Sequence, residues 1–256
     1  MKFVDIDQHT VYPGAAGASA PVIYVVDASE HPFDLSESAA DLACTVVTVA
    51  VRNWNDSLTP WPAPGIYRGE PDFGGDAATT LAELVDEAIP AIEAIVELAP
   101  AKRAICGYSL GGLFALYAFA HADAGARTGA TTHVPDSAAA PRAAEASSGE
   151  GVLPRMPVFA ACACLSGSVW YQGWVDHLRG LDFDGTGRFA FLSIGSKEKH
   201  AAPKILHHVQ DNMAECADIL RAHGCEAEFA VGPGNHMAFI RDRFAAGLTA
   251  LDRFLT

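Results

Sequence analysis

The sequence predicts an α/β protein with a mainly parallel central sheet and helices on both of its faces. Three observations support this prediction. The chain has 256 residues, of which 50% are hydrophobic, so it can bury a large core. Short β-branched runs alternate with longer stretches of helical periodicity, and strands separated by helices pair in parallel. Several of the short runs are apolar without interruption, which is typical of strands covered on both faces.

The elements are predicted in chain order from these patterns. Apolar runs predict strands at residues 21–27, 44–51, 102–106, 157–165, 188–194 and 225–231. Helical spacing of apolar residues predicts helices at 77–98, 110–120, 203–223 and 237–255, with a kink at Pro90 in the first of them.

We expect a single domain over residues 1–256, with a low-complexity insertion at about 122–156. That segment consists mainly of Ala, Gly, Ser, Thr and Pro, so it has few large apolar side chains with which to pack. It is therefore expected to be mobile. It is interpreted either as a tolerated surface insertion or as a lid over a site.

Charge and cysteine content limit the kinds of partner. Asp and Glu number 31 against 17 Lys and Arg, and the net charge is −14. Nucleic acids and anionic membranes attract clustered basic residues, so neither is an expected partner. Early carboxylates and the lack of a long apolar run favour a cytoplasmic protein. The six cysteines are expected to be reduced, buried thiols, and no metal site is expected.

The most informative motif is Gly-x-Ser-x-Gly at residues 107–111. It follows a predicted strand and precedes a predicted helix, which is the context that a nucleophile elbow requires. A serine in this turn is strained and lifted above the sheet edge, and the helix behind it offers amides and the positive end of its dipole. Ser109 is therefore the candidate nucleophile. The alternative is a glycine-rich turn with an incidental serine.

A serine hydroxyl needs a base to take its proton, and in this arrangement the base comes late in the chain. Of the ten histidines, His236 stands between the last predicted strand and the last predicted helix. An acid before it should orient the imidazole. Glu198 is the carboxylate in the turn after the strand at 188–194. Its neighbours Lys197 and Lys199 equally fit a solvated, charged turn.

Two backbone N–H groups should face the oxygen that becomes negative during acyl transfer. Leu110, which follows the serine, is one candidate. Trp54, in the loop after the second predicted strand, is the other, with Asn53 and Asn55 beside it. The loop continues through a stiff, aromatic stretch at 58–64, which either lines a pocket or packs on the surface.

Four segments together resemble one family: GYSLGG around Ser109, NWNDSLTPWPAP from Asn53, SGSVWY from Ser166 and the late GNH that ends at His236. They are similar to the putative-esterase branch of the α/β-hydrolases, which includes esterase D-like and enterochelin-esterase-like enzymes. The resemblance runs from about residue 21 to the C-terminus without residues 122–156, and it implies the α/β-hydrolase fold.

The resemblance also implies hydrolysis of carboxylic esters through an acyl-enzyme, without a cofactor. It assigns Ser109 and His236 to catalysis and Leu110 to the oxyanion hole. Glu198 is a looser match, because some relatives manage with a Ser–His pair. The residues expected at the substrate pocket are Asn53, Asn55, Tyr108 and Trp170.

We therefore expect a serine carboxylic ester hydrolase that acts on a small or aromatic ester. One rival on the same scaffold is an acyltransferase, in which an acceptor alcohol replaces water. A second rival is a catalytically silent binding protein, because a fold alone does not establish activity. The sequence does not identify the acyl group, the alcohol or the oligomeric state.

Overall fold

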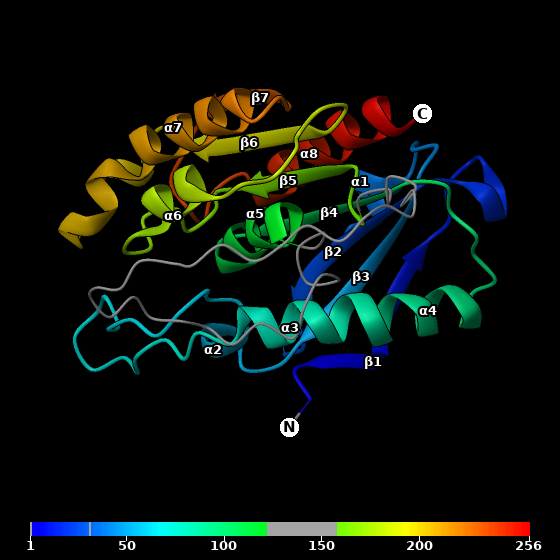
Figure 1. Ribbon diagram of the computed structural model, residues 1–256, viewed down its shortest axis with the longest axis horizontal. Coiled ribbons are helices and arrows are strands. Elements are labelled where there is room, and N and C mark those ends of the chain that lie inside the picture. The colour runs from blue at the N-terminus through cyan, green and yellow to red at the C-terminus, as the bar shows by residue number, and fades with distance from the viewer. Residues whose placement is uncertain (1, 31, 122–157) are drawn as a thin grey trace, which may run out of the picture.

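Figure 1 shows the computed structural model, which describes residues 2–30, 32–121 and 158–256. Seven strands form one sheet in the order β1-β3-β2-β4-β5-β6-β7. β1 is antiparallel to β3 at one edge, and all the other pairs are parallel. The predicted α/β class with a mainly parallel sheet is confirmed. The strands are β1 (Val4–Tyr12), β2 (Val22–Ala28), β3 (Thr45–Val51), β4 (Arg103–Tyr108), β5 (Ala161–Leu165), β6 (Phe189–Gly195) and β7 (Glu226–Gly232).

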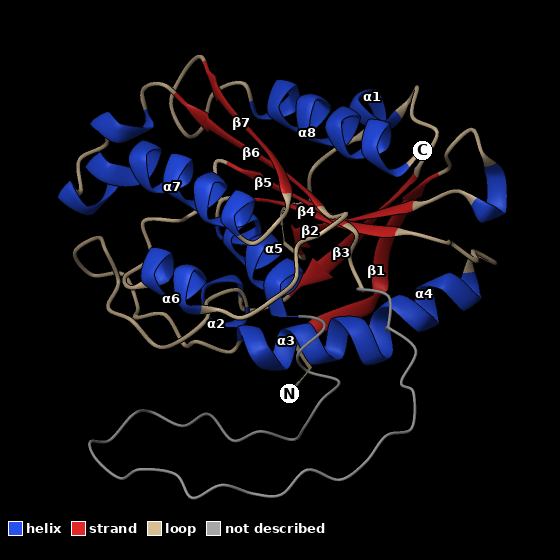
Figure 2. Ribbon diagram, turned by 45° about the horizontal axis from the view of Figure 1, so that its top comes forward, coloured by secondary structure: helices blue, strands red, loops and turns tan. Residues whose placement is uncertain are grey.

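Helices cover both faces of the sheet (Figure 2). The α-helices are α1 (Ser36–Ala39), α2 (Trp54–Ser57), α3 (Ala77–Glu83), α4 (Ile89–Ile95), α5 (Leu110–His121), α6 (Trp174–Gly180), α7 (Val209–Ala222) and α8 (Ile240–Leu255). The π-helical turn η2 (Leu84–Ala88) joins α3 to α4, and the 3₁₀ turns are η1 (Gly17–Ser19), η3 (Glu198–His200) and η4 (Lys204–His208).

The sheet separates two hydrophobic cores because successive strand residues point to opposite faces. Tyr24 of β2 packs with α3 to α7 on one face, whereas its neighbour Val25 packs with α1 and α8 on the other. In β4, Ile105 and Cys106 divide in the same way. Burial on both faces explains why these strands are continuously apolar in sequence.

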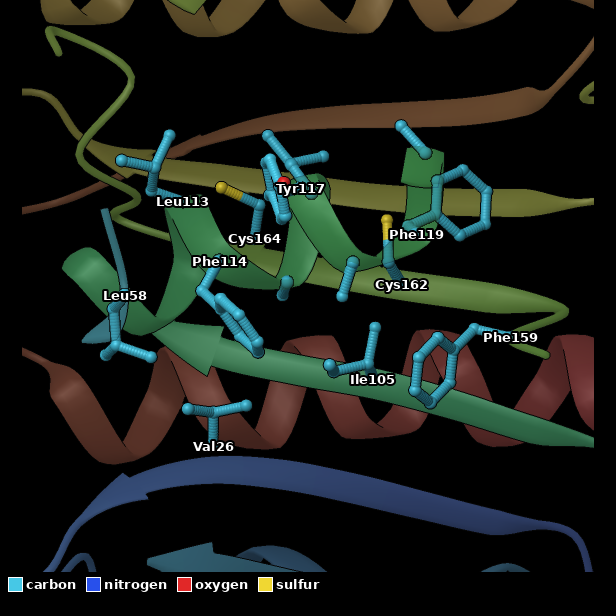
Figure 3. Packing of buried hydrophobic residues seen from close by; sticks show 14 of the residues in the cluster. Val26, Leu58, Ile105, Leu113, Phe114, Tyr117, Phe119, Phe159, Cys162 and Cys164 are labelled. Atoms are coloured by element: carbon cyan, nitrogen blue, oxygen red, sulfur yellow. The ribbon is translucent and has the colours of Figure 1, made fainter. Parts of the chain in front are cut away.

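α5 is the central helix of the larger core. Eleven of its twelve residues are buried, as expected for a helix that is apolar on every side. Figure 3 shows α5 lying over the strands, and its side chains Phe114 and Tyr117 belong to the same buried cluster as Ile105 and Cys164. The N-terminus of this well-packed helix is thereby fixed relative to the end of β4.

The structure differs from the sequence predictions at several elements. β1 was not predicted, because it mixes charged and apolar residues and its edge position leaves much of it exposed. The predicted helix at 77–98 is divided by η2, and Pro90 lies in the first turn of α4, where its missing N–H is tolerated. The predicted helix at 203–223 begins as the 3₁₀ turn η4, and α8 begins three residues later than expected, at Ile240.

The insertion predicted at 122–156 lies outside the described residues. All six cysteines lie within them and are buried as free thiols. Within the ranges given above, no helix combines the length and apolarity needed to cross a bilayer. The same part of the chain brings no three His, Cys, Asp or Glu side chains together in a metal-binding arrangement.

Candidate active site

The Gly-x-Ser-x-Gly motif forms the tight turn that the sequence predicted. β4 ends at Tyr108, α5 begins at Leu110, and Ser109 between them has a φ of 59°. This left-handed conformation is strained for a residue with a side chain. A Cβ atom at Gly107 would lie 2.1 Å from the carbonyl oxygen of Gly111. The turn therefore requires glycine at position 107.

His236 and Glu198 reach Ser109 from two other strand ends. His236 follows β7, and Glu198 begins the turn η3 after β6. The Nε2 atom of His236 lies 3.0 Å from the Oγ of Ser109, and its Nδ1 lies 2.8 Å from the Oε2 of Glu198. With Nδ1–H donating to the carboxylate, Nε2 is free to accept the serine proton. The structure thus brings the three predicted side chains into one hydrogen-bonded chain.

Glu198 is buried, with only 6% of the residue exposed, so the alternative of a solvated turn is wrong. Its Oε1 accepts hydrogen bonds from the N–H of Gly195 at 2.7 Å and the hydroxyl of Ser166 at 2.7 Å. Burial raises the pKa of the carboxyl, but the hydrogen bond and charge of His236, helped by Gly195 and Ser166, lower it by more. The resulting pKa lies below the ordinary value, so Glu198 is ionised at neutral pH.

A buried cation also faces Glu198, and the sequence analysis missed it. Arg243 of α8 is 5% exposed, and its Nη1 lies 3.3 Å from the Oε1 of Glu198. A signal for it existed in the sequence. Helical spacing puts Arg243 on the same stripe as the buried Gly247 and Leu251, and a cation on an apolar helix face needs a partner inside the protein.

Tyr108 was expected at the substrate pocket, but this expectation is wrong. The residue is only 3% exposed and its side chain lies within the second core. Its ring contacts Phe33 and Phe244, with centroids 6.0 and 5.8 Å away. Its hydroxyl donates to the carbonyl oxygen of His236 and accepts a hydrogen bond from Arg243 at 2.6 Å. Tyr108 therefore supports the loop that carries His236.

Backbone strain is concentrated in the segments that build this site. Five non-glycine residues among those described have positive φ, and four of them lie here: Ser109, Asn53 before α2, Ser166 after β5 and Phe239 before α8. Each such conformation costs about 1–3 kcal/mol and persists only where surrounding contacts hold it. The cores below the site supply those contacts.

The two candidate oxyanion donors, Leu110 and Trp54, are each the first residue of a helix. Amides at this position have no acceptor within their own helix. The Trp54 ring packs against the elbow, since a Cβ atom at Gly111 would lie 3.2 Å from its Cη2. Asn53 and Asn55 flank Trp54, and the left-handed Asn53 (φ 54°) starts the short helix α2. Both donors therefore belong to segments that meet at the elbow.

Trp170, which was predicted at the substrate pocket, lines a cavity of about 350 Å³ together with Phe73, Tyr171 and Lys204 among others. Backbone hydrogen bonds join one of its lining segments to the elbow. The N–H of Ser168 donates to the carbonyl of Ser109 at 3.0 Å, and the N–H of Tyr171 donates to the carbonyl of Ser168 at 3.0 Å. The turn that carries Trp170 is thus attached to the elbow.

The chain is similar to known proteins both in sequence and in structure. Residues 8–124 match the family described as Putative esterase. The chain is 26% identical over 215 residues to the uncharacterized protein YbbA of Bacillus subtilis (strain 168), which covers 80% of this chain and 72% of that protein.

Two solved structures are similar over nearly the whole chain. An IroE-like serine hydrolase from Shewanella oneidensis has a TM-score of 0.67 at 17% identity, covering 96% of this chain and 75% of that one. The siderophore hydrolase EstA from Aspergillus nidulans has a TM-score of 0.65 at 18% identity, covering 94% and 85%. These similarities confirm the α/β-hydrolase fold.

Replacing Glu198 by Gln should destabilise the protein, because the buried Arg243 would lose its anionic partner. We expect a loss of about 3 kcal/mol at neutral pH, which lowers Tm by about 6 °C or more. Because the folded-state pKa of Glu198 lies below the ordinary 4.5, this contribution exists above that pH and disappears as the pH falls through the folded-state pKa.

Thermal melts across this pH range test the prediction. The difference in Tm between wild type and Glu198→Gln should narrow below a pH of 4.5, the ordinary value for the carboxyl. Glu226→Gln, at an exposed position on the edge strand β7, is the matched control and should change Tm little. A difference that stays constant with pH would contradict the assignment of the stabilising charge to Glu198.

Proposed function

We propose that the chain belongs to the putative-esterase branch of the α/β-hydrolases and is a serine carboxylic ester hydrolase acting through an acyl-enzyme, in line with its similarity to that family over residues 8–124. The observation that carries this proposal is the chain of contacts from Glu198 through His236 to Ser109, at 2.8 and 3.0 Å. A base within hydrogen-bond reach of a serine, itself oriented by a carboxylate, is the arrangement that activates a hydroxyl for nucleophilic attack.

In the proposed reaction, the Oγ of Ser109 attacks the ester carbonyl carbon while Nε2 of His236 takes the hydroxyl proton. The carbonyl oxygen becomes negative, and the N–H groups of Leu110 and Trp54 are the proposed donors that stabilise it. His236 then gives its proton to the departing alcohol, which leaves the acyl group on Ser109. Water attacks this second ester by the same route in reverse and frees the acid. Glu198 stabilises the imidazolium throughout.

Access of water favours hydrolysis over acyl transfer. The side chain of His236 is 39% exposed, so a water molecule can reach the base that must activate it. An acyltransferase needs to keep water from the acyl-enzyme, which requires a closed site. The exposed imidazole therefore supports an ester hydrolase as the proposed function. An acyltransferase that uses an acceptor alcohol is the alternative.

The cavity beside the turn at Trp170 is the proposed pocket for one part of the ester. Its aromatic lining pairs Phe73 with Trp170 at a centroid distance of 6.1 Å and with Tyr171 at 5.4 Å. Flat aromatic groups pack well against such walls. A small or aromatic ester is therefore the proposed substrate class, with no cofactor required.

The six buried free thiols support a reducing compartment as the place of action, and we propose the cytoplasm.

Replacing Ser109 by Ala should abolish ester hydrolysis, because the acyl group loses its attachment point. The fold should remain, since one hydroxyl at a strained turn contributes little stability. Hydrolysis of an aryl acetate and covalent labelling by a fluorophosphonate measure the effect. Ser36→Ala, at an exposed position in α1, is the control and should retain both. Activity of the wild-type kind in Ser109→Ala would end this proposal.

The acid is tested by Glu198→Gln, assayed well below its Tm. Glutamine keeps the size of the side chain but removes the charge that stabilises the imidazolium. We expect turnover to fall at least about 100-fold, within the roughly 10⁴-fold known for loss of a triad acid. Glu226→Gln should leave turnover unchanged. A fall of less than about threefold would mean that Ser109 and His236 act without this acid.

The proposed pocket is tested by Trp170→Ala with a panel of esters that differ in the size of one group. The KM for an ester with an aromatic group should rise about fivefold or more, because a ring–ring contact is lost, while an ester with two small groups should be unaffected. Tyr67→Ala, at a residue 47% exposed, controls for loss of a surface aromatic. An equal effect on all esters would place the substrate elsewhere.

A further inference from the structure

Arg243 joins more parts of the candidate site than its position in a helix suggests. Its Nη1 donates to the hydroxyl oxygens of Tyr108 at 2.6 Å and of Ser166 at 2.9 Å. Its Nη2 donates to the carbonyl oxygens of Pro233 and Asn235, both at 3.1 Å. These contacts reach the ends of β4 and β5 and the loop after β7. β4 leads into Ser109, the loop after β7 carries His236, and Ser166 after β5 contacts Glu198.

Two of these contacts continue directly to the proposed catalytic pair. The Ser166 hydroxyl that accepts from Arg243 donates in turn to Oε1 of Glu198 at 2.7 Å. The Tyr108 hydroxyl that accepts from Arg243 donates to the carbonyl oxygen of His236. The guanidinium therefore holds Glu198 and His236 in place through Ser166 and Tyr108. It contacts neither Ser109 nor the residues that line the proposed substrate cavity.

We propose that Arg243 is a positioning residue that sets both the geometry and the charge balance of the His236–Glu198 pair. This inference rests on the proposed function for its kinetic consequences. The geometric part comes from the fork of N–H donors, which holds the loop at 233–236 at a fixed place relative to Glu198. The electrostatic part comes from the permanent positive charge 3.3 Å from Oε1.

The positive charge of Arg243 should affect the protonation of His236 in one direction. A cation beside Glu198 keeps the carboxylate ionised, but it also opposes a second positive charge on the imidazole. Among the described residues, the charged or titratable groups that contact His236 are Glu198 from η3, Tyr108 from β4 with ring centroids 5.3 Å apart, and Arg243 from α8, whose Nη1 lies 3.5 Å from the carbonyl oxygen of His236. Removing the Arg243 charge should therefore stabilise protonated His236. The base would then be occupied by a proton up to a higher pH.

A second buried arginine provides the comparison that separates this role from simple packing. Arg188 is 2% exposed and donates through Nη2 to the carbonyl of Phe159 at 3.0 Å and to that of Phe119. It precedes β6 and so lies at the opposite end of the parallel strands from Glu198. Loss of either arginine removes a buried cation with carbonyl partners, but only Arg243 faces the catalytic pair.

The experiment measures two quantities in Arg243→Gln, Arg243→Lys and Arg188→Gln. The first is the midpoint of the His236 imidazole titration by NMR, which needs no enzymatic activity. The second is the kcat and KM for an aryl ester across pH. In Arg243→Gln we expect the midpoint and the acidic limb of kcat/KM to rise by about half a pH unit or more. We also expect kcat to fall at least about tenfold with KM nearly unchanged.

Arg243→Lys separates the two parts of the role. Lysine keeps the charge but cannot reproduce the fork, so the midpoint should stay near that of wild type while kcat still falls at least about threefold. This conservative variant also keeps the test decisive if Arg243→Gln does not fold. In that case, an Arg243→Lys protein with the kcat of wild type overturns the proposal.

The control variant Arg188→Gln distinguishes an effect of the Arg243 charge from a general loss of stability. Arg188→Gln should lower Tm without moving the His236 midpoint or the acidic limb. A midpoint that does not rise in Arg243→Gln, or that rises equally in Arg188→Gln, overturns the proposal. If the midpoints behave as expected but the wild type hydrolyses no ester, the proposed function fails while the positioning role of Arg243 stands.

Discussion

The carboxylate of Glu198 is the contact on which the site depends, because it joins segments that are far apart in the sequence. His236 after β7, Ser166 after β5 and Arg243 in α8 all meet this one buried group. A buried carboxylate without such partners costs several kcal/mol. Each segment therefore holds the others in place, and the loss of one leaves a buried charge or donor unpaired.

The parallel sheet explains why these segments can meet. In a parallel sheet all the carboxyl ends lie on one edge, and loops that follow neighbouring strands come together there. Ser109, Ser166, Glu198 and His236 follow β4, β5, β6 and β7, which are consecutive in the sheet. The strained residues of the site lie at this same edge, above two cores that are closely packed. Strain at the edge is held by the stability of the layers below it.

The amino-acid pattern predicted the parts of this arrangement that are local. The elbow could be recognised because a backbone contact at 2.1 Å requires glycine at position 107, and His236 could be recognised because chain order restricts where a base can come. The setting of Glu198 could not be recognised, since Lys197 and Lys199 beside it are typical of a solvated turn. Burial of Glu198 arises from partners 32 to 45 residues away in sequence, and no local pattern records them.

The partners of Arg243 and the orientation of Tyr108 could not be predicted from local sequence either. The pattern of α8 marks Arg243 as a cation on a buried stripe, but it does not say which anion it meets. Tyr108 was assigned to the pocket because it neighbours the nucleophile. Alternation along β4 instead turns its side chain into the second core. β1 escaped prediction because an edge strand is exposed and need not be apolar.

The buried cysteines give the protein an internal reporter of opening at the elbow. Cys106 of β4 and Cys164 of β5 lie in two paired strands that are followed directly by Ser109 and Ser166. Burial raises the pKa of both thiols, and the protonated, enclosed form of a thiol reacts slowly with alkylating reagents. The rate at which these two cysteines are alkylated under native conditions therefore follows how often the strands beneath the elbow separate. It measures the local stability of the site through groups that take no part in its chemistry.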